Sequence, residues 1–155
     1  MSLVAYGFGL DSTLGGGGTR ITLAELTLDI GEVVDVDLGT YPKARPIKIC
    51  YARGDTAPIL FAITLSGAIV DITGYTFQFT VNSERNPVDT ANEKFSIAGV
   101  ITDAVNGELE FRPSAVNTDL ASANYYYDVS MVDTGGFKTT VAKASFIIEQ
   151  DIDKS

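Results

Sequence analysis

Residue types that commonly carry out catalysis or bind metals are scarce in this chain. The 155-residue sequence has no histidine and one cysteine, Cys50. Histidine is the most frequent general base and metal ligand, and zinc sites built from cysteine need several of them. Cys50 lies in the apolar stretch PIKICYA, which favours a small buried hydrophobe over a nucleophile. We therefore expect no catalytic residue, no metal site and no cofactor.

Two pairs of aspartates recur two residues apart, Asp35 with Asp37 and Asp151 with Asp153. In a β-strand such a spacing places both carboxylates on one face. Glycoside hydrolysis instead requires two carboxylates that face each other across a cleft, one of them with a raised pKa. We interpret both pairs as solvated strand faces rather than as an active site.

The tripeptide Arg53-Gly54-Asp55 is an adhesion ligand when an exposed loop presents it. Here Thr56 and an apolar run follow at once. Gly54 permits a positive φ, and Asp55 can accept hydrogen bonds from nearby backbone amides. We therefore predict that Gly54, Asp55 and Thr56 mark the beginning of a strand.

Three consecutive tyrosines, Tyr125, Tyr126 and Tyr127, form the densest aromatic cluster. In a strand, Tyr125 and Tyr127 share one face and Tyr126 takes the other. The surrounding sequence TDLASANYYYDV resembles the approach to a tyrosine corner, in which a tyrosine hydroxyl bonds back to the backbone. We predict that Tyr125 and Tyr127 are structural core residues. The alternatives are a subunit contact through Tyr126 and a sugar-binding aromatic platform.

The N-terminal segment is rich in glycine, and Gly15 to Gly18 form a flexible joint. These glycines lack the Lys-Ser/Thr of a phosphate-binding loop. Ahead of them lies a set of apolar residues that solubility does not explain: Leu3, Val4, Tyr6, Phe8 and Leu10. Either this segment folds back on its own domain, or it is an arm that binds a neighbouring subunit. We name these five residues, with Tyr126, as candidate partner-binding residues.

Strand signals recur along the rest of the chain. Residues 20–38 alternate apolar and polar positions on both sides of a turn at 29–32, which predicts a β-hairpin. From residue 47 onward, short alternating segments are joined by Gly, Asn and Asp turns. Residues 75–81 place Phe77 and Phe79 on one face, so we predict both in the core. The one helix-like segment is SAVNTDLASA, where Ser114 can cap a single turn.

These patterns predict an all-β protein of two parts. Residues 1–45 form an extended Gly-rich arm with a β-hairpin, and residues 46–155 form an antiparallel β-sandwich, which the family resemblance given below implies is immunoglobulin-like.

Charge argues against two classes of partner. The formal net charge is −9 and the isoelectric point is about 4.3, so the protein repels phosphate backbones and anionic lipids. No apolar run approaches the roughly 18 residues of a membrane-spanning helix. The N-terminus also lacks the basic region of a secretory signal. We expect binding neither to nucleic acid nor to membranes.

The stretch RGDTAPILFAITLSGAIVDITGYTFQFTV resembles the beginning of the immunoglobulin-like domain found at the N-terminus of phage baseplate upper proteins. The similar features are the Gly54-Asp55-Thr56 step into an apolar strand, the Val-Asp-Ile-Thr-Gly step at 70–74 and the aromatic strand at 75–81. GVITDAVNGELEFRP and the closing hairpin through residue 153 are similar to the family's later strands. Residues 1–46 lie outside the resemblance.

The resemblance implies a virion structural protein without catalysis, assembled in the bacterial host cytoplasm. Its expected role is an adaptor of the tail or baseplate, with other virion proteins and copies of itself as partners, so a homo-oligomer is expected. A head decoration protein is the alternative in the same class. A carbohydrate-binding module is the alternative from another class, and it predicts exposed, coplanar tyrosines.

Overall fold

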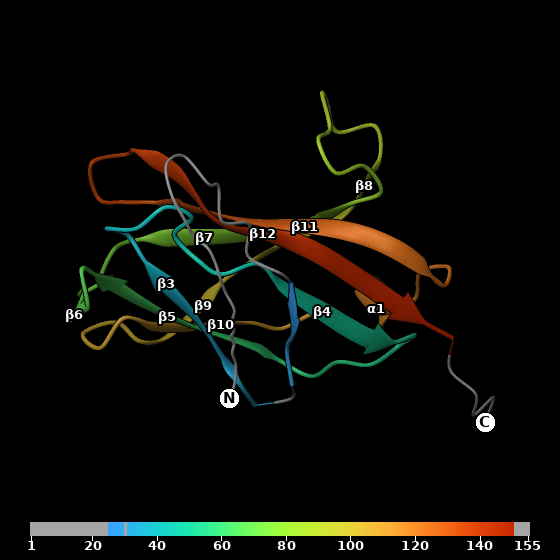
Figure 1. Ribbon diagram of the computed structural model, residues 1–155, viewed down its shortest axis with the longest axis horizontal. Coiled ribbons are helices and arrows are strands. Elements are labelled where there is room, and N and C mark those ends of the chain that lie inside the picture. Colours follow the sequence, from blue (N-terminus) through green and yellow to red (C-terminus); the bar gives the residue numbers. More distant parts are fainter. Residues whose placement is uncertain (1–24, 30, 151–155) are drawn as a thin grey trace, which may run out of the picture.

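The computed structural model describes residues 25–29 and 31–150, which form two β-sheets packed face to face (Figure 1). One sheet has the order β3-β5-β10-β9, with β6 also paired to β5; its strands are β3 (Val33–Asp37), β5 (Ile59–Leu65), β6 (Ala68–Ile69), β9 (Val100–Asp103) and β10 (Glu108–Phe111). The other has the order β2-β4-β12-β11-β7-β8; its strands are β2 (Leu26–Thr27), β4 (Ile47–Ala52), β7 (Thr76–Asn82), β8 (Glu93–Ala98), β11 (Ala123–Val132) and β12 (Lys138–Glu149). The prediction of an all-β sandwich is confirmed.

Both sheets are mixed, whereas the sequence predicted antiparallel pairing. β3 runs parallel to β5, and β4 runs parallel to both β12 and β2. The expected hairpin within residues 20–38 is wrong for the part that the structure describes, because β2 and β3 join different sheets. The turn before β3 carries the chain across the sandwich instead of reversing it within one sheet. A period-two pattern fixes which side chains face inward but does not choose the partner strand.

The sandwich also begins earlier than the predicted boundary at residue 46. Val34 and Val36 on β3 are fully buried and belong to the same apolar core as Phe61 on β5. β3 is therefore an integral strand of the sandwich and not part of an arm.

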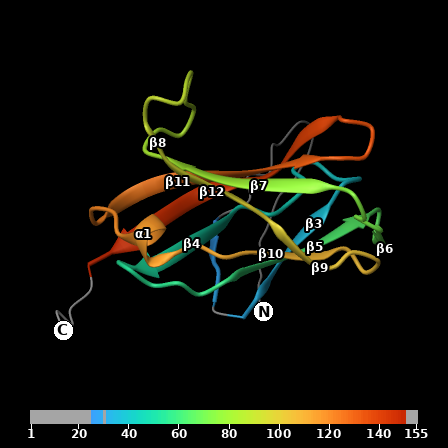
Figure 2. The same ribbon diagram turned by 180° about the vertical axis from the view of Figure 1, so that it is seen from behind.

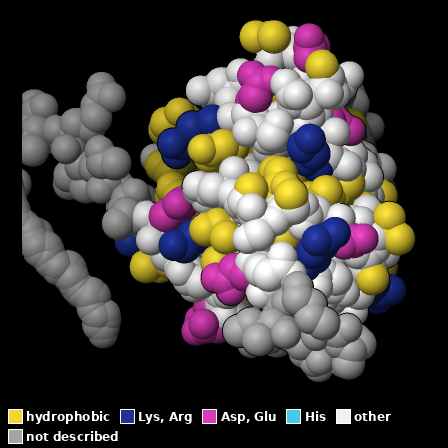
Figure 3. All heavy atoms as spheres, turned by 90° about the vertical axis from the view of Figure 1, so that its right-hand side faces the viewer, with side chains coloured by type: hydrophobic (Ala, Val, Ile, Leu, Met, Phe, Trp, Pro, Cys, Tyr) yellow, Lys and Arg dark blue, Asp and Glu magenta, His cyan; other side chains and the backbone are white. Residues whose placement is uncertain are grey.

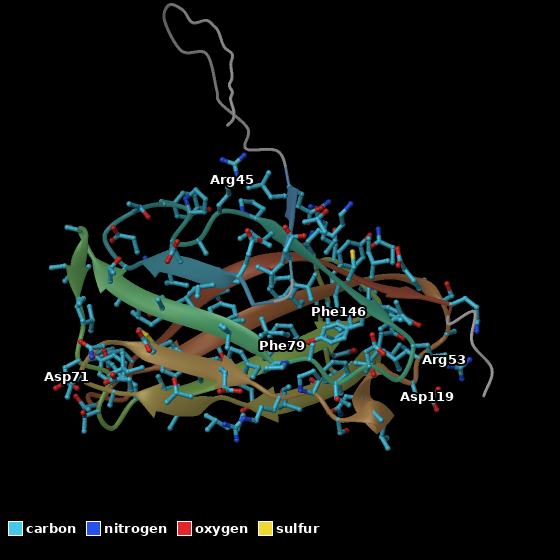
Figure 4. All side chains as sticks on the ribbon, turned by 90° about the horizontal axis from the view of Figure 1, so that it is seen from below. Arg45, Arg53, Asp71, Phe79, Asp119 and Phe146 are labelled. Carbon is cyan, nitrogen blue, oxygen red and sulfur yellow. The ribbon has the colours of Figure 1, made fainter. Side chains whose placement is uncertain are left out.

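Aromatic side chains fill the space between the sheets. The ring of Phe79 stacks on Tyr127 at 5.0 Å between ring centres and meets Phe146 edge-on at 6.0 Å. Figure 4 shows Phe79 and Phe146 between the two layers. The structure places the four predicted core residues in this core: Phe77, Phe79, Tyr125 and Tyr127. Alternation on β7 and β11 accounts for this, since every second side chain of a strand faces the same sheet surface.

Two tyrosines of β11 donate hydrogen bonds from their hydroxyls to backbone carbonyls elsewhere in the fold. Tyr125 Oη donates to the carbonyl of Ala121 at 2.8 Å, which is the tyrosine-corner geometry that the sequence suggested. Tyr127 Oη donates to the carbonyl of Ile47 at 2.7 Å and so joins β11 to the beginning of β4. Both hydroxyls satisfy a backbone acceptor inside the fold, as buried polar groups require.

The chain crosses from β8 to β9, and hence from one sheet to the other, at Gly99. A Cβ built there would lie 3.0–3.1 Å from Leu109, Phe77 and Phe111. The amide of Gly99 still bonds to the carbonyl of Phe77 at 2.8 Å. A side chain at this position would require its core neighbours to shift by a few tenths of an ångström, so glycine suits the close approach.

The helix α1 (Ala115–Thr118) is a single turn between β10 and β11. Ser114 caps it, because its Oγ accepts a hydrogen bond from the amide of Asn117 at 3.2 Å. The predicted cap at Ser114 is confirmed.

Candidate interaction surface

Several turns meet at one end of the sandwich, and we call this region the turn end. It consists of residues 38–43, 65–74, 104–107 and 133–137. Figure 1 shows β6 and the β11–β12 connection together at the left of the molecule, and Figure 2 shows them together from behind. A backbone hydrogen bond from Ile72 N to Ala104 O at 2.9 Å links the second segment to the third, and one from Ile63 N to Gly107 O at 2.8 Å links the third segment to β5.

Asp37 joins two of the segments. Its carboxylate accepts hydrogen bonds from the amides of Gly39 at 2.9 Å, Ser66 at 2.7 Å and Gly67 at 3.1 Å. The amide of Gly39, followed by that of Ser66, holds the pKa of Asp37 below its usual range. One carboxylate at the end of β3 therefore fixes both its own loop and the β5–β6 turn.

Three further aspartates each fix the turn that follows them. Asp71 accepts from the amide and hydroxyl of Thr73, and the hydroxyl bond at 2.6 Å is the main cause that lowers its pKa. Asp103 accepts from the amide of Asn106, and Asp133 accepts from the amides two and four residues later. Aspartate favours such turns because its side chain can replace a backbone acceptor. The turn end is thus ordered by its own side chains.

These fixed turns present large apolar side chains to solvent. Ten such side chains are exposed in the described part of the chain, and five of them lie at the turn end, between 51% and 98% exposed: Tyr41, Leu65, Ile69, Val105 and Phe137. Scattered apolar residues are ordinary on a surface, but half of the exposed large ones in the described part stand at this one end, and exposed apolar side chains are what protein–protein contacts bury.

The opposite end differs in character. Figure 3 looks onto it and shows apolar side chains interspersed with basic and acidic ones. The Arg53-Gly54-Asp55 turn lies there, with Arg53 Nε 2.5 Å from Asp119 Oδ1 and Thr118 Oγ1 donating to the carbonyl of Asp55. Figure 4 shows Arg53 and Asp119 together at this end and Asp71 at the other.

The tripeptide is therefore part of a turn that its own chain holds in place. Gly54 has a φ of +91°, in the left-handed region that favours glycine. Gly54, Asp55 and Thr56 lie in the connection between β4 and β5, and β5 begins only at Ile59. The strand thus begins three residues after Thr56.

The tyrosine cluster is divided between two environments. Tyr125 and Tyr127 are buried in the core, whereas Tyr126 is half-buried on the outer face of its sheet. The guanidinium of Arg85 lies 5.7 Å from the centre of the Tyr126 ring. The three tyrosines do not form the exposed, coplanar platform that a carbohydrate-binding module built on them requires.

The candidate arm residues Leu3, Val4, Tyr6, Phe8 and Leu10, the glycines 15–18 and the pair Asp151 and Asp153 lie outside the described residues. The structure does describe the point at which the N-terminal segment joins the fold. The carboxylate of Glu25 accepts hydrogen bonds from the amide of Ser145 at 2.6 Å and from its hydroxyl at 3.0 Å. Residue 25 is thus fixed beside β12, next to the edge strand β2.

Two observations on the described part concern metal binding and the reactivity of Cys50. Across residues 25–29 and 31–150, no three His, Cys, Asp or Glu side chains are grouped to hold a metal ion. Cys50 is half-buried on β4, and burial raises the pKa of its thiol, which disfavours the nucleophilic thiolate. Within the same residues, no helix has the length and apolar character needed to cross a membrane.

Sequence reasoning missed the turn end, although part of the signal was present. Asp71, Asp103 and Asp133 each precede a Gly by three, four and two residues, respectively, which indicates turns. What the sequence did not indicate is that these turns, with the loop after β3, converge at one end. That convergence depends on which strands pair and on the crossing of β3 into the second layer.

Comparisons with known proteins found no family and only distant similarities among solved structures. No protein-family profile matches the sequence, and no curated protein matches it. One similar solved structure is the N-terminal domain of phage TP901-1 ORF48, at 17% identity and a TM-score of 0.48, covering 81% of this chain and 98% of that one. Another is CopC from Methylosinus trichosporium OB3b, at 14% identity and a TM-score of 0.39, covering 70% and 89%. At such identities the similarity concerns the path of the chain alone.

Proposed function

We propose that this protein is a non-enzymatic structural subunit of a bacteriophage virion, an adaptor of the tail or baseplate that binds other virion proteins and copies of itself. The observation that carries the proposal is the turn end, where five exposed apolar side chains stand on turns fixed by aspartates. The resemblance of residues 47–153 to phage baseplate upper domains supplies the phage context.

The turn end has two physical properties that favour stable assembly. Its apolar side chains lose water on contact, which is the main favourable contribution to protein association. Its turns are already ordered, so less conformational entropy is lost when a partner binds. Both properties make binding to a neighbour more favourable for a subunit that must hold one position in a particle.

The N-terminal segment offers a second contact in the same proposal. Glu25 fixes its origin at the edge of the six-stranded sheet, and the five apolar residues at 3–10 precede a glycine joint. An arm of this kind can add a strand to a neighbouring sheet edge through main-chain hydrogen bonds. The turn end and the arm are separate parts of the subunit, so together they would connect it to more than one neighbour.

Incorporation into particles tests the proposal. The double variant Ile69→Ser and Phe137→Ser removes two apolar side chains from the turn end, and Val88→Ser and Val116→Ser form the matched control elsewhere on the surface. All four side chains are exposed, so we expect unchanged melting temperatures for both variants. In phage that lack the wild-type gene, we expect at least a tenfold loss of incorporation for the turn-end variant and normal incorporation for the control.

The same particles separate the two structural roles. A copy number per virion of the order of a tail or baseplate ring supports the adaptor, and one that follows the capsid lattice identifies a head decoration protein instead. Normal incorporation of the turn-end variant, or absence of the protein from purified particles, overturns the proposal.

A further inference from the structure

A groove lies on the outer face of the six-stranded sheet. The loop of residues 83–92 between β7 and β8 stands above this face, as Figures 1 and 2 show. The groove measures about 510 Å³, within the roughly 300–1,000 Å³ that is typical of small-molecule sites. It lies on a sheet face and extends to Val132 and Lys138, the residues that flank the turn at 133–137.

Strand pairing sets a row of polar side chains across the floor of this groove. Asp128 on β11 is opposite Lys143 on β12 and opposite Thr80 on β7, and Thr80 is opposite Ser96 on β8. Their sequence neighbours Val129 and Phe79 point inward, so the row faces outward. Four strands therefore contribute one charged or hydroxyl side chain each.

A second row runs beside the first. Ser130 on β11 is opposite Thr140 on β12 and Gln78 on β7. The two rows are joined, because Gln78 Nε2 donates to Ser96 Oγ at 2.8 Å and Ser96 Oγ lies 2.8 Å from Thr80 Oγ1. A hydroxyl both donates and accepts hydrogen bonds, so this floor can match groups of either kind.

Asp128 is the central group of the floor. Its side chain is half-buried, and no hydrogen bond reaches its carboxylate from any residue of the described part. Burial raises its pKa, and the nearby Lys143 and Lys138 partly oppose that rise. Hydrogen-bond donors supplied by a ligand would stabilise this partly desolvated carboxylate.

The loop forms a defined wall on one side. Arg85 lies over the ring of Tyr126, and Asn86 Oδ1 accepts a hydrogen bond from Lys143 Nζ at 3.0 Å. Within the loop, the side-chain Nδ2 of Asn92 donates a hydrogen bond to the carboxylate of Glu84. These contacts hold the loop against β11 and β12, so the groove has a shaped side as well as a floor.

We propose that this groove binds a short neutral saccharide, with Asp128 accepting hydrogen bonds from its hydroxyl groups and Thr80, Ser96, Ser130 and Gln78 bonding to further hydroxyls. The aromatic edge of Tyr126 borders one side of the bound ring. This site differs from a platform of tyrosines, because hydroxyl and carboxylate side chains provide most of its contacts.

Other ligand classes fit less well. A phosphate or another anion would meet Asp128 and a chain of net charge −9. The charged side chains that line the groove are mixed, three basic and four acidic, so neither a cation nor an anion finds a site of one opposite sign: Arg85, Lys138, Lys143, Glu84, Asp89, Glu93 and Asp128. A peptide that binds by strand addition would pair with the free edge of β8, beside the groove, and would leave the floor on β11 and β7 uncovered, because those two strands are paired on both sides. A neutral molecule rich in hydroxyl groups avoids all three conflicts.

Titration of the full chain with defined trisaccharides of glucose, galactose and N-acetylglucosamine tests the site. We expect at least one of them to shift the backbone NMR signals of Thr80, Ser96, Asp128 and Ser130, with the turn end unchanged. Asp128→Asn should weaken that binding roughly tenfold or more by calorimetry, since hydrogen bonds to a charged group are the stronger ones. Asp35→Asn, an exposed carboxylate on the outer face of β3, is the matched control and should bind as the wild type does.

A second variant distinguishes a loss of binding from misfolding of Asp128→Asn. Thr80→Val keeps the branched shape that suits a strand and replaces the hydroxyl by a methyl group, so it should fold and still weaken binding. The proposal is overturned if none of the three trisaccharides shifts the groove signals, if inorganic phosphate shifts them more than any trisaccharide does, or if Asp128→Asn and Thr80→Val both bind normally. Since the proposed ligand contacts use no residue of the turn end, the outcome does not depend on whether the protein is a virion subunit.

Discussion

At the scale of single residues, side chains that bond to the backbone shape this molecule more than ion pairs do. Asp37 receives three backbone amides from two segments, and Tyr127 reaches the carbonyl of Ile47 across the fold. The Arg53–Asp119 and Arg112–Glu110 pairs are largely exposed on their arginine side chains. Exposed ion pairs contribute little to stability, whereas hydrogen bonds that satisfy buried or turn backbone groups contribute more.

Replacement of Asp37 by Ala should lower the melting temperature at neutral pH, because three amides lose their acceptor. The folded pKa of Asp37 is lowered, so its contribution is present above the unfolded value of about 3.9 and is lost as the pH falls through the folded value. The difference in melting temperature between wild type and variant should therefore shrink below about pH 4. Asp35→Ala on the same strand is the control, and an equal loss of stability in it would contradict this role for Asp37.

Replacement of Tyr127 by Phe should lower the free energy of unfolding by about 1–3 kcal/mol, because the carbonyl of Ile47 loses its donor in a buried setting. Tyr126→Phe removes a hydroxyl from the neighbouring outward-facing ring and should change stability by no more than about 0.5 kcal/mol. Urea denaturation of both variants measures the contrast. Equal effects from the two variants would mean that the Tyr127 hydrogen bond adds nothing to stability.

At the scale of elements, the connections determine how two layers form from short strands. Gly99 moves the chain from β8 into β9, and the segment before β3 moves it from the six-stranded sheet to the other one. Both crossings put consecutive strands in different layers. The alternation along each strand then buries one face of each sheet, which is what produces a sandwich rather than a single twisted sheet.

Replacement of Gly99 by Ala should destabilise the fold by about 1–3 kcal/mol, the usual result of adding a methyl group to a packed core. The added Cβ would meet Leu109, Phe77 and Phe111 at 3.0–3.1 Å. Ala98→Ser adds one atom at the adjacent exposed position and should leave stability nearly unchanged. Chemical denaturation compares the two variants, and a Gly99→Ala protein as stable as the wild type would show that the core can move to accept the methyl group.

At the scale of the whole molecule, one sandwich carries surfaces of different character. The turn end is apolar and fixed, the outer face of the six-stranded sheet holds a polar groove, and the N-terminal segment starts from the edge of that same sheet. Separation of these surfaces allows a subunit to be held by neighbours while one sheet face stays accessible. The rigid double-layer core positions all three.

Truncation of the chain at two points should separate folding from assembly. A chain that begins at residue 25 keeps β2 and β3, so it should unfold cooperatively near the wild-type temperature and yet enter particles poorly. A chain that begins at residue 46 loses Val34 and Val36 from the core and exposes the edge of β5, so it should lack a cooperative thermal transition. Circular dichroism and particle incorporation measure the two effects. A stably folded 46–155 chain would contradict the assignment of β3 to the sandwich.

The sequence by itself determined the features that depend on near neighbours. Alternation identified the strand at 75–81 and its inward-facing Phe77 and Phe79, and local hydrogen-bonding preference identified the Ser114 cap and the Tyr125 corner. Such features follow from the backbone geometry and side-chain chemistry of a few consecutive residues.

Only the tertiary structure decided which strands became neighbours. It showed that β3 pairs in parallel with β5, that Asp37 reaches the turn at Ser66 and that Asp128, Thr80 and Ser96 form one row across three strands. The period-two pattern is compatible with many pairings, and the choice among them depends on the burial of the whole core and on the closure of long loops. The core residues could therefore be predicted from the sequence, whereas the turn end and the groove, which join segments far apart in the chain, could not.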